Sequence, residues 1–280
     1  MSAPLQIGLL IFPNVTQLDL TGPVQVFSGV PGAKLHLIWK RIEPVPSDSV
    51  LVLTPTTTFA DCPQLDVICV PGGFGVDDMV NDEEMLQFLR DQAKGAKYVT
   101  SVCTGSLVLG AAGLLRGYRA ATHWTAMENL SAFGATPTKT RVCIDRNRVT
   151  GGGVTAGIDF ALTLVAMLLD EKTAQAIQLR LEYNPAPPFN AGSPDTAPAE
   201  VVALINDRNV SNKARRAEAV ARGGAADRER LTPKARRQKK AAWFPRRPFL
   251  SYDGPTLTGD FRTLLTGGLI PGPVLIGCRC

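Results

Sequence analysis

The chain has 280 residues, of which 45% are hydrophobic and 20% charged, and this balance predicts a large buried core and excludes global disorder. Its net charge of +5 arises in residues 206–250, which contain 14 Lys/Arg and 4 Asp/Glu. Residues 1–205 contain 14 Lys/Arg and 19 Asp/Glu and are therefore mildly acidic. This excess of acidic residues argues against specific nucleic-acid binding. No apolar run approaches the roughly 20 residues of a membrane-spanning helix, and the first residues do not resemble a signal peptide, so we expect a cytoplasmic protein with reduced thiols and no membrane partner.

Apolar strands alternate with helices through residues 1–205, which we interpret as one α/β domain. The first strand is almost entirely apolar, which is typical of a strand that is covered on both faces. In chain order, strands are expected at 5–12, 34–39, 50–53, 65–70 and 97–102, helices at 21–27, 81–94, 104–112, 158–169 and 171–182, and a hairpin at 141–150. This order predicts a single open, mostly parallel sheet flanked by helices.

The pattern changes after Ile205. Residues 206–280 combine Arg/Lys clusters, the pair Gly223-Gly224 and closely spaced prolines, without a helical period of apolar residues. We therefore expect the domain to end at residue 205 and residues 206–280 to be disordered. The abrupt change in charge favours the hypothesis of an out-of-frame extension; a genuine tail could bind polyanions non-specifically through its basic part.

Cys103 lies where a predicted strand meets a predicted helix, and three small residues follow it at 104–106. This is the arrangement of a nucleophile elbow, in which a strand turns sharply into a helix with the nucleophile at the bend. The N–H groups at the helix start are expected to lower the thiol pKa below its free value of about 8.5. The alternative is an inert buried thiol, which is the interpretation retained for Cys62, Cys69 and Cys143.

Asp19 lies between two leucines in a stretch otherwise suited to a core. It either caps the following helix or is an acid whose pKa is raised by apolar surroundings, so that it can donate and accept a proton. Thr104 likewise either caps the helix after Cys103 or holds a substrate through its hydroxyl. Ligands of open α/β sheets bind beyond the carboxyl ends of the strands, where Asp19 and Cys103 both fall.

Three further residues are candidates for substrate binding. The pair Gly72-Gly73 follows the predicted strand at 65–70 and could supply N–H donors beside Cys103, although such a pair is also an ordinary turn. His123 is the histidine placed late enough to be a partner of the cysteine, with local hydrogen bonds as the alternative role. The six cysteines and two histidines have no metal-site spacing, so no metal is expected.

Nine short segments of the first 205 residues form a combination that is typical of one family. They are Phe12-Pro13, Gln17-Leu-Asp-Leu-Thr-Gly-Pro23, Val70-Pro-Gly-Gly73, Ser101-Val-Cys-Thr-Gly105, Ala112-Gly-Leu-Leu115, Thr122-His-Trp124, Thr150-Gly-Gly-Gly153, Ala156-Gly-Ile-Asp159 and Gln178-Leu-Arg-Leu-Glu-Tyr183. Together they resemble the ThiJ/PfpI family of the class I glutamine amidotransferase-like superfamily. The resemblance implies a flavodoxin-like fold, a homodimer, and no metal or organic cofactor.

Within that family, three features are most similar to the branch that hydrates isonitriles. They are Asp19 in its Leu-Asp-Leu-Thr-Gly-Pro segment, Thr104 directly after Cys103, and the loop at 186–194. The resemblance implies that a small-molecule isonitrile and water become an N-substituted formamide. Cys103 would then add to the isonitrile carbon to give a thioimidate, Asp19 would supply the proton and later activate water, and Thr104 would orient the substrate or the acid.

Two other branches of the family remain as alternatives. Protease and deglycase branches place Glu where Asp19 stands, and the proteases follow the cysteine with His, where this chain has Thr104. Ligand-sensing transcription regulators share the Cys-Thr-Gly and Thr-His-Trp motifs but add a helix-turn-helix region. We predict no recognition helix in residues 206–280, because that stretch lacks amphipathic periods.

Overall fold

Seven strands form the central sheet in the order β10-β11-β7-β6-β1-β2-β5. The computed structural model describes residues 3–230 and residue 232. The strands are β1 (Leu5–Leu10), β2 (Ala33–Trp39), β5 (Thr57–Thr58), β6 (Val67–Val70), β7 (Tyr98–Ser101), β10 (Val142–Asp145) and β11 (Arg148–Gly151). All neighbours are parallel except β10, which runs antiparallel to β11. The open, mostly parallel sheet predicted from the sequence is therefore confirmed.

Two short strand pairs accompany the sheet. β3 (Val45–Pro46) pairs antiparallel with β4 (Val52–Leu53), and β8 (Arg119–Ala120) pairs parallel with β9 (Thr136–Pro137). The predicted hairpin of β10 and β11 turns at Arg146, whose φ of 55° is left-handed.

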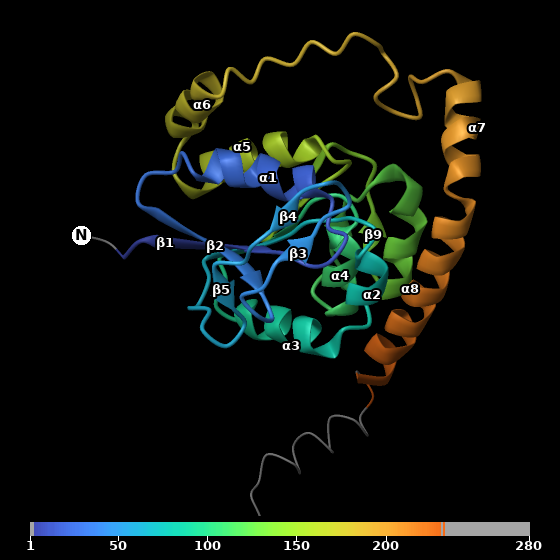
Figure 1. The fold of residues 1–280 in the computed structure, drawn as a ribbon, viewed down its shortest axis with the longest axis horizontal. Coiled ribbons are helices and arrows are strands. Elements are labelled where there is room, and N and C mark those ends of the chain that lie inside the picture. Colours follow the sequence, from blue (N-terminus) through green and yellow to red (C-terminus); the bar gives the residue numbers. More distant parts are fainter. Residues whose placement is uncertain (1–2, 231, 233–280) are drawn as a thin grey trace, which may run out of the picture. The chain divides into compact units, whose positions relative to one another are not determined.

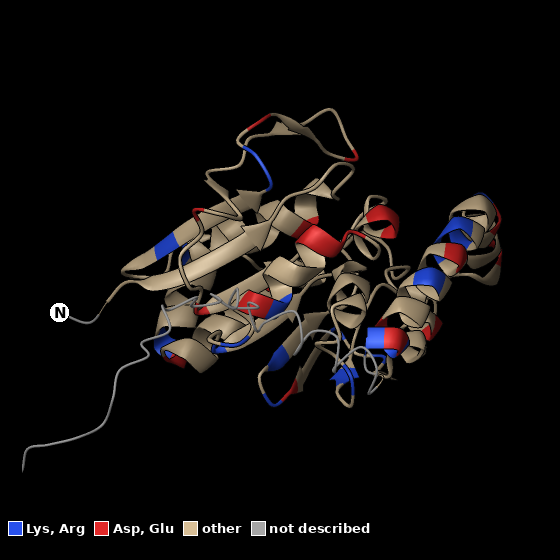
Figure 2. Cartoon of the chain, turned by 90° about the horizontal axis from the view of Figure 1, so that it is seen from below, with Lys and Arg blue, Asp and Glu red and all other residues tan. Residues whose placement is uncertain are grey.

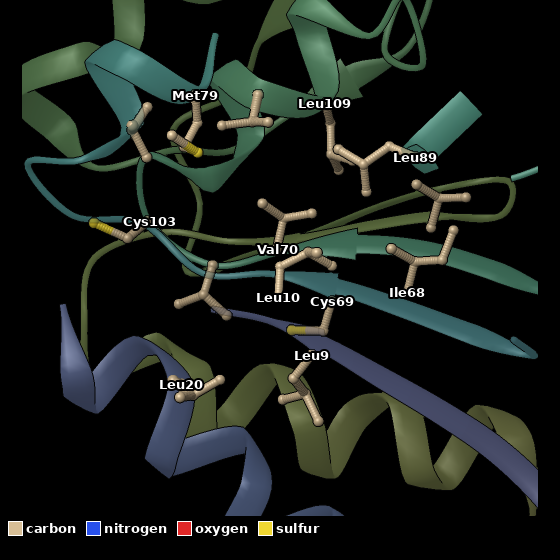
Figure 3. Packing of buried hydrophobic residues seen from close by; sticks show 14 of the residues in the cluster. Leu9, Leu10, Leu20, Ile68, Cys69, Val70, Met79, Leu89, Cys103 and Leu109 are labelled. Carbon is tan, nitrogen blue, oxygen red and sulfur yellow. The ribbon is translucent and has the colours of Figure 1, made fainter. Parts of the chain in front are cut away.

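Helices cover both faces of the sheet (Figure 1). One face carries α1 (Gln17–Phe27), α5 (Ala156–Leu168) and α6 (Glu171–Arg180), and the other carries α2 (Val76–Met79), α3 (Glu83–Gln92), α4 (Gly105–Ala111) and the 3₁₀ helix η1 (Trp124–Phe133). Leu9 and Leu20 pack on one side of the strands and Leu89 and Leu109 on the other (Figure 3). This burial on two faces explains why the strands are apolar throughout instead of alternating.

Helix α1 begins at Gln17, four residues before the predicted start at Thr21. Pro23 therefore lies inside the helix rather than in the first turn, where proline is most easily accommodated. The earlier start places Asp19 in the first turn of α1, beyond the carboxyl end of β1.

The prediction that disorder begins at residue 206 is wrong for residues 206–230, which form the end of α7 (Ala199–Arg208), a turn at Asn209 and the whole of α8 (Val210–Arg230). The buried face of α8 consists of Ala219, Val220, Gly223, Gly224 and Asp227. A Cβ on Gly223 would lie 2.9 Å from the carbonyl oxygen of Val80, and one on Gly224 would lie 3.2 Å from that of Ala132. The glycine pair thus permits close helix packing, and a face of such small residues gives no apolar period. Residues 231 and 233–280 of the predicted tail lie outside the described residues, so the hypothesis of an out-of-frame extension is not tested there.

Polar contacts also attach α8 to the α/β domain. The buried Asp227 forms an ion pair with Arg116 of the domain and another with Arg230 of its own helix. The Asn81 side chain donates a hydrogen bond to the carbonyl of Ala219 at 3.1 Å. Both signs of charge occur along α7 and α8 (Figure 2), so their basic residues do not form a surface of one sign. Within the described part of the chain, no helix is both long and apolar enough to cross a membrane.

Candidate active site

The predicted site residues meet where adjacent parallel strands end. Asp19 follows β1, Gly72 and Gly73 follow β6, and Cys103 follows β7, and these three strands are neighbours in the sheet. The sheet order therefore brings together residues that are up to 84 positions apart in the chain. This edge of the sheet is where open α/β proteins bind ligands.

Cys103 adopts the strained backbone of a nucleophile elbow. Its φ is 55°, a left-handed conformation that costs a residue with a side chain about 1–3 kcal/mol. The conformation is held by a hydrogen bond from its N–H to Gly151 O at 3.2 Å, and by bonds to its carbonyl from the hydroxyls of Thr122 at 3.0 Å and Ser106 at 3.2 Å. Figure 3 shows Cys103 beyond the ends of the strands, at the turn. The predicted elbow is therefore present.

The Asp19 carboxyl is fully buried beside this thiol. Its Oδ2 accepts a hydrogen bond from Gly72 N–H at 2.9 Å, whereas no N–H or O–H donor in the described part of the chain reaches Oδ1. Burial raises the pKa of Asp19 to about 7, although the Cys103 thiol and the Gly72 N–H partly oppose this by hydrogen bonding to the carboxylate. Asp19 lies inside α1, whose N-cap is Thr16, so of the two roles that the sequence left open the raised pKa favours the acid. Such a pKa suits a group that both donates and accepts a proton.

The pKa of Cys103 differs from the prediction. Burial and the neighbouring Asp19 carboxylate raise it well above its usual value, and the Thr104 N–H and the Arg216 charge only partly oppose them. The predicted lowering was wrong because α4 has only seven residues, and the N-terminus of so short a helix is outweighed by burial of the sulfur beside an acid. At neutral pH the thiol therefore retains its proton beside the Asp19 carboxyl.

The N–H groups of Gly72 and Gly73 bind the side chains of Asp19 and Thr104, so they are not free to bind a substrate. The Gly72 N–H is used by Asp19, and the Gly73 N–H donates to Thr104 Oγ1 at 3.0 Å. The prediction that these N–H groups contact a substrate therefore has no support in the structure. A Cβ on Gly72 would lie 2.8 Å from Asp19 Oδ2 and 2.7 Å from Thr104 Oγ1, so a glycine is required there. The Thr104 side chain makes no capping bond to α4, which removes the helix-cap alternative.

His123 lies in the wall of the same cavity, but no hydrogen bond joins it to Cys103 within the described structure. Its Nδ1 contacts Thr125 Oγ1 at 2.8 Å and accepts a bond from Thr125 N–H at 3.3 Å. Burial lowers the pKa of His123, so the ring is neutral at pH 7. The local hydrogen bonds predicted as its alternative role are present.

The site opens into a cavity of about 230 Å³. Its lining residues are Thr16, Asp48, Gly73, Phe74, Cys103, Thr104, His123, Thr125, Val154, Asn209, Asn212, Lys213 and Arg216. Of these residues the sequence predicted Gly73, Cys103, Thr104 and His123, and it missed the other nine. The last four come from the start of α8 and the residue before it. Their spacing of i, i+3, i+4 and i+7 is helical, but polar residues carry it, so a search for apolar periods passes over them.

The remaining thiols and metal-ligand types do not form a second centre in residues 3–230. Burial raises the pKa of Cys62 to about 11 and that of Cys69 to about 12, and neither thiol lines the cavity that Cys103 lines. No group of three or more His, Cys, Asp or Glu that could hold a metal ion occurs in this part of the chain.

The fold and the site define an α/β protein with an elbow cysteine beside a buried carboxyl. Residues 6–167 match the model of the DJ-1/PfpI family, and the chain belongs to this family. It is 58% identical over 221 residues to isonitrile hydratase of Pseudomonas putida, a match that covers 79% of this chain and 97% of that protein. A ThiJ/PfpI family protein from Pseudomonas syringae is similar in structure, with a TM-score of 0.76, 46% identity and coverage of 78% and 90%. The transcriptional regulator GbdR of Pseudomonas aeruginosa is 33% identical over 189 residues. That match covers 64% of this chain and 51% of the regulator.

Proposed function

We propose that the chain is an isonitrile hydratase, which adds water to an isonitrile and releases an N-substituted formamide. The observation that carries this proposal is the fully buried Asp19 carboxyl, with a pKa of about 7, beside the Cys103 thiol at the strand-to-helix turn. The 58% identity to isonitrile hydratase of Pseudomonas putida supports the same activity.

The first step places both sulfur and hydrogen on the terminal carbon of the isonitrile. The thiol proton passes to the Asp19 carboxylate as the sulfur forms a bond to that carbon, and the protonated Asp19 then donates the proton to the same carbon. The product is a thioimidate, R–N=CH–S–Cys103, and Asp19 is again a carboxylate. The Thr104 hydroxyl, which accepts the Gly73 N–H, keeps the loop after β6 in place beside these groups.

The second step is addition of water to the thioimidate carbon. Asp19 accepts one proton from the attacking water and passes it to the nitrogen, giving R–NH–CH(OH)–S–Cys103. The carbon–sulfur bond then breaks, the hydroxyl proton returns to the sulfur, and R–NH–CHO leaves. The site thus regains a neutral thiol and an ionised carboxyl, which is the state of the resting structure at pH values between the two pKa values.

The cavity favours a small substrate. Its volume of about 230 Å³ is below the roughly 300–1,000 Å³ of pockets that hold drug-sized ligands. Phe74 and Val154 supply apolar wall on one part of the lining, which suits a compact hydrocarbon substituent on the isonitrile nitrogen.

We also propose that the enzyme works as a homodimer in the cytoplasm. Leu179 on α6 is 81% exposed and Phe189 in the following loop is 78% exposed, and we propose these two side chains as contacts of the partner subunit. The cysteines of the described residues are free thiols, which suits a reducing compartment. Light scattering after gel filtration measures the oligomeric state directly.

The test of the proposed function is incubation with a small alkyl isonitrile while formamide is followed by NMR. We expect formamide from the unaltered protein, none from Cys103→Ala or Asp19→Asn, and unchanged turnover from Cys143→Ala, which removes another buried thiol. Product formation by Asp19→Asn at the normal rate would refute the proton path. Binding of the isonitrile without turnover would instead favour a sensing role, as in the transcriptional regulators.

A further inference from the structure

The start of helix α8 closes one side of the Cys103 cavity. Asn212, Lys213 and Arg216 of α8, with Asn209 just before it, line the cavity, and the same side of the helix continues into its buried small-residue face. The α8 segment is therefore fixed against the domain at the point where it meets the active site.

The carboxylate of Asp77 fixes two consecutive arginines of α8 in different environments. Asp77 lies in α2 and is 3% exposed; its Oδ1 accepts from Arg216 Nε at 2.8 Å and its Oδ2 from Arg215 Nε at 3.0 Å. Arg215 also donates to the carbonyl of Phe74. The Arg216 side chain is 11% exposed and lines the cavity, whereas that of Arg215 is 54% exposed and does not.

The charged side chains around the Cys103 thiol include one cation that is placed to stabilise a negative charge on the sulfur. Asp19 lies beside the sulfur from α1 and Asp48 contributes a carboxylate to the cavity wall. His123 is neutral at pH 7 because burial and Arg216 lower its pKa. The wall contains two cations in the described residues, and the ammonium of Lys213 is hydrogen-bonded to Asn206 on α7 at 2.8 Å. Arg216 is the cation whose charge reaches both the thiol and His123.

We propose that Arg216, held by Asp77, is an electrostatic residue of the active site that stabilises the Cys103 thiolate. When the thiol proton moves to Asp19, the sulfur becomes negative in a buried place where few waters can solvate it. A fixed guanidinium in the wall of the same cavity stabilises that charge without reorganising during the reaction. In the proposed hydration, on which this second part of the inference rests, the same charge stabilises the negative character of the adduct until its carbon is protonated.

The experiment measures alkylation of Cys103 by iodoacetamide as a function of pH, with the modified peptide followed by mass spectrometry, so no isonitrile is needed. For Arg216→Gln we expect the midpoint of the profile to move up by about one pH unit, so that the rate at pH 7.5 falls about tenfold. Arg216→Lys should retain most of the rate. Arg215→Gln is the matched control, because it removes the same charge from the same helix and the same carboxylate but from outside the cavity; its profile should follow that of the unaltered protein.

Two results would overturn the inference: a profile for Arg216→Gln that coincides with the unaltered protein, or equal shifts for Arg215→Gln and Arg216→Gln. Thermal unfolding of each variant checks the fold, and Arg216→Met, which retains the apolar stem, serves if the Gln variant does not fold. The outcome is separate from that of the proposed function. A protein that hydrates no isonitrile but shows the Arg216-specific shift would refute the hydratase and keep the electrostatic role.

Discussion

Replacement of Asp19 by Asn tests the buried carboxyl through the stability of the fold. The folded-state pKa is about 7 and the ordinary value is 3.8, so between these values the folded chain binds a proton that the unfolded chain has released. Stability therefore falls as the pH rises from about 4 to 7. A shift of about three units corresponds to a loss of about 4 kcal/mol above pH 7, of which about 3 kcal/mol falls between pH 5 and pH 8. Asn carries no charge and keeps an oxygen acceptor for the Gly72 N–H, so it avoids this loss.

The assay is urea unfolding of Asp19→Asn and of the unaltered protein at pH 5, 6, 7 and 8. The variant should gain about 3 kcal/mol over the unaltered protein between pH 5 and pH 8, while losing turnover. Asp78→Asn, which removes an exposed carboxyl on α2, controls for a general effect of negative charge. If the difference in unfolding free energy between Asp19→Asn and the unaltered protein is the same at all four pH values, Asp19 is not held near neutrality and the proton path loses its basis.

Three further predictions concern the same elbow. In Gly105→Ala the new Cβ would lie 2.1 Å from the carbonyl oxygen of Val70, so we expect destabilisation at or above the upper end of about 1–3 kcal/mol, measured by urea unfolding; a neutral result would contradict the close strand–helix approach. Thr104→Val leaves the buried Gly73 N–H without its acceptor, which should cost about 1–3 kcal/mol and lower kcat for an isonitrile; unchanged stability would show that the bond is replaced. The kcat/KM of the unaltered protein should rise about tenfold per pH unit below pH 7 and level off above it, as Asp19 ionises; a flat profile from pH 5 to 8 would exclude Asp19 as the group that receives the thiol proton.

The parts of the fold that the sequence predicts are those whose signals are local. A strand buried on two faces must be apolar along its length, so the runs around Leu9 and Ile68 identify the central strands. The elbow is visible because a sharp strand-to-helix turn excludes large side chains after Cys103. Asp19 stands out because a carboxyl inside an apolar stretch requires a compensating contact, and the structure supplies it from Gly72.

The parts that the sequence does not reveal depend on contacts between distant segments. Helix α8 packs through glycine and alanine and lines the cavity through Lys213 and Arg216, so neither of its faces carries the large apolar side chains that periodicity detects. The use of the Gly73 N–H by Thr104 is likewise a tertiary contact. The pKa of Cys103 depends on how deeply the sulfur is buried and on its distance from a carboxyl 84 positions earlier, and neither quantity can be obtained from the motif around it.

The raised pKa of Cys103 is consistent with the proposed chemistry, even though a lowered one was expected. Formation of the thioimidate requires a nucleophile and a proton at the same carbon, so the site must keep one proton close to the sulfur. A thiol with a strongly lowered pKa would release that proton to water before the isonitrile arrived. Burial raises the pKa values of Cys103 and Asp19 together, which leaves a single proton on the pair, carried by the sulfur, above about pH 7. The positive charge of Arg216 then stabilises the sulfur only when this proton moves to Asp19. The cost of keeping both groups buried is the loss of folding stability that the ionised Asp19 carboxylate causes.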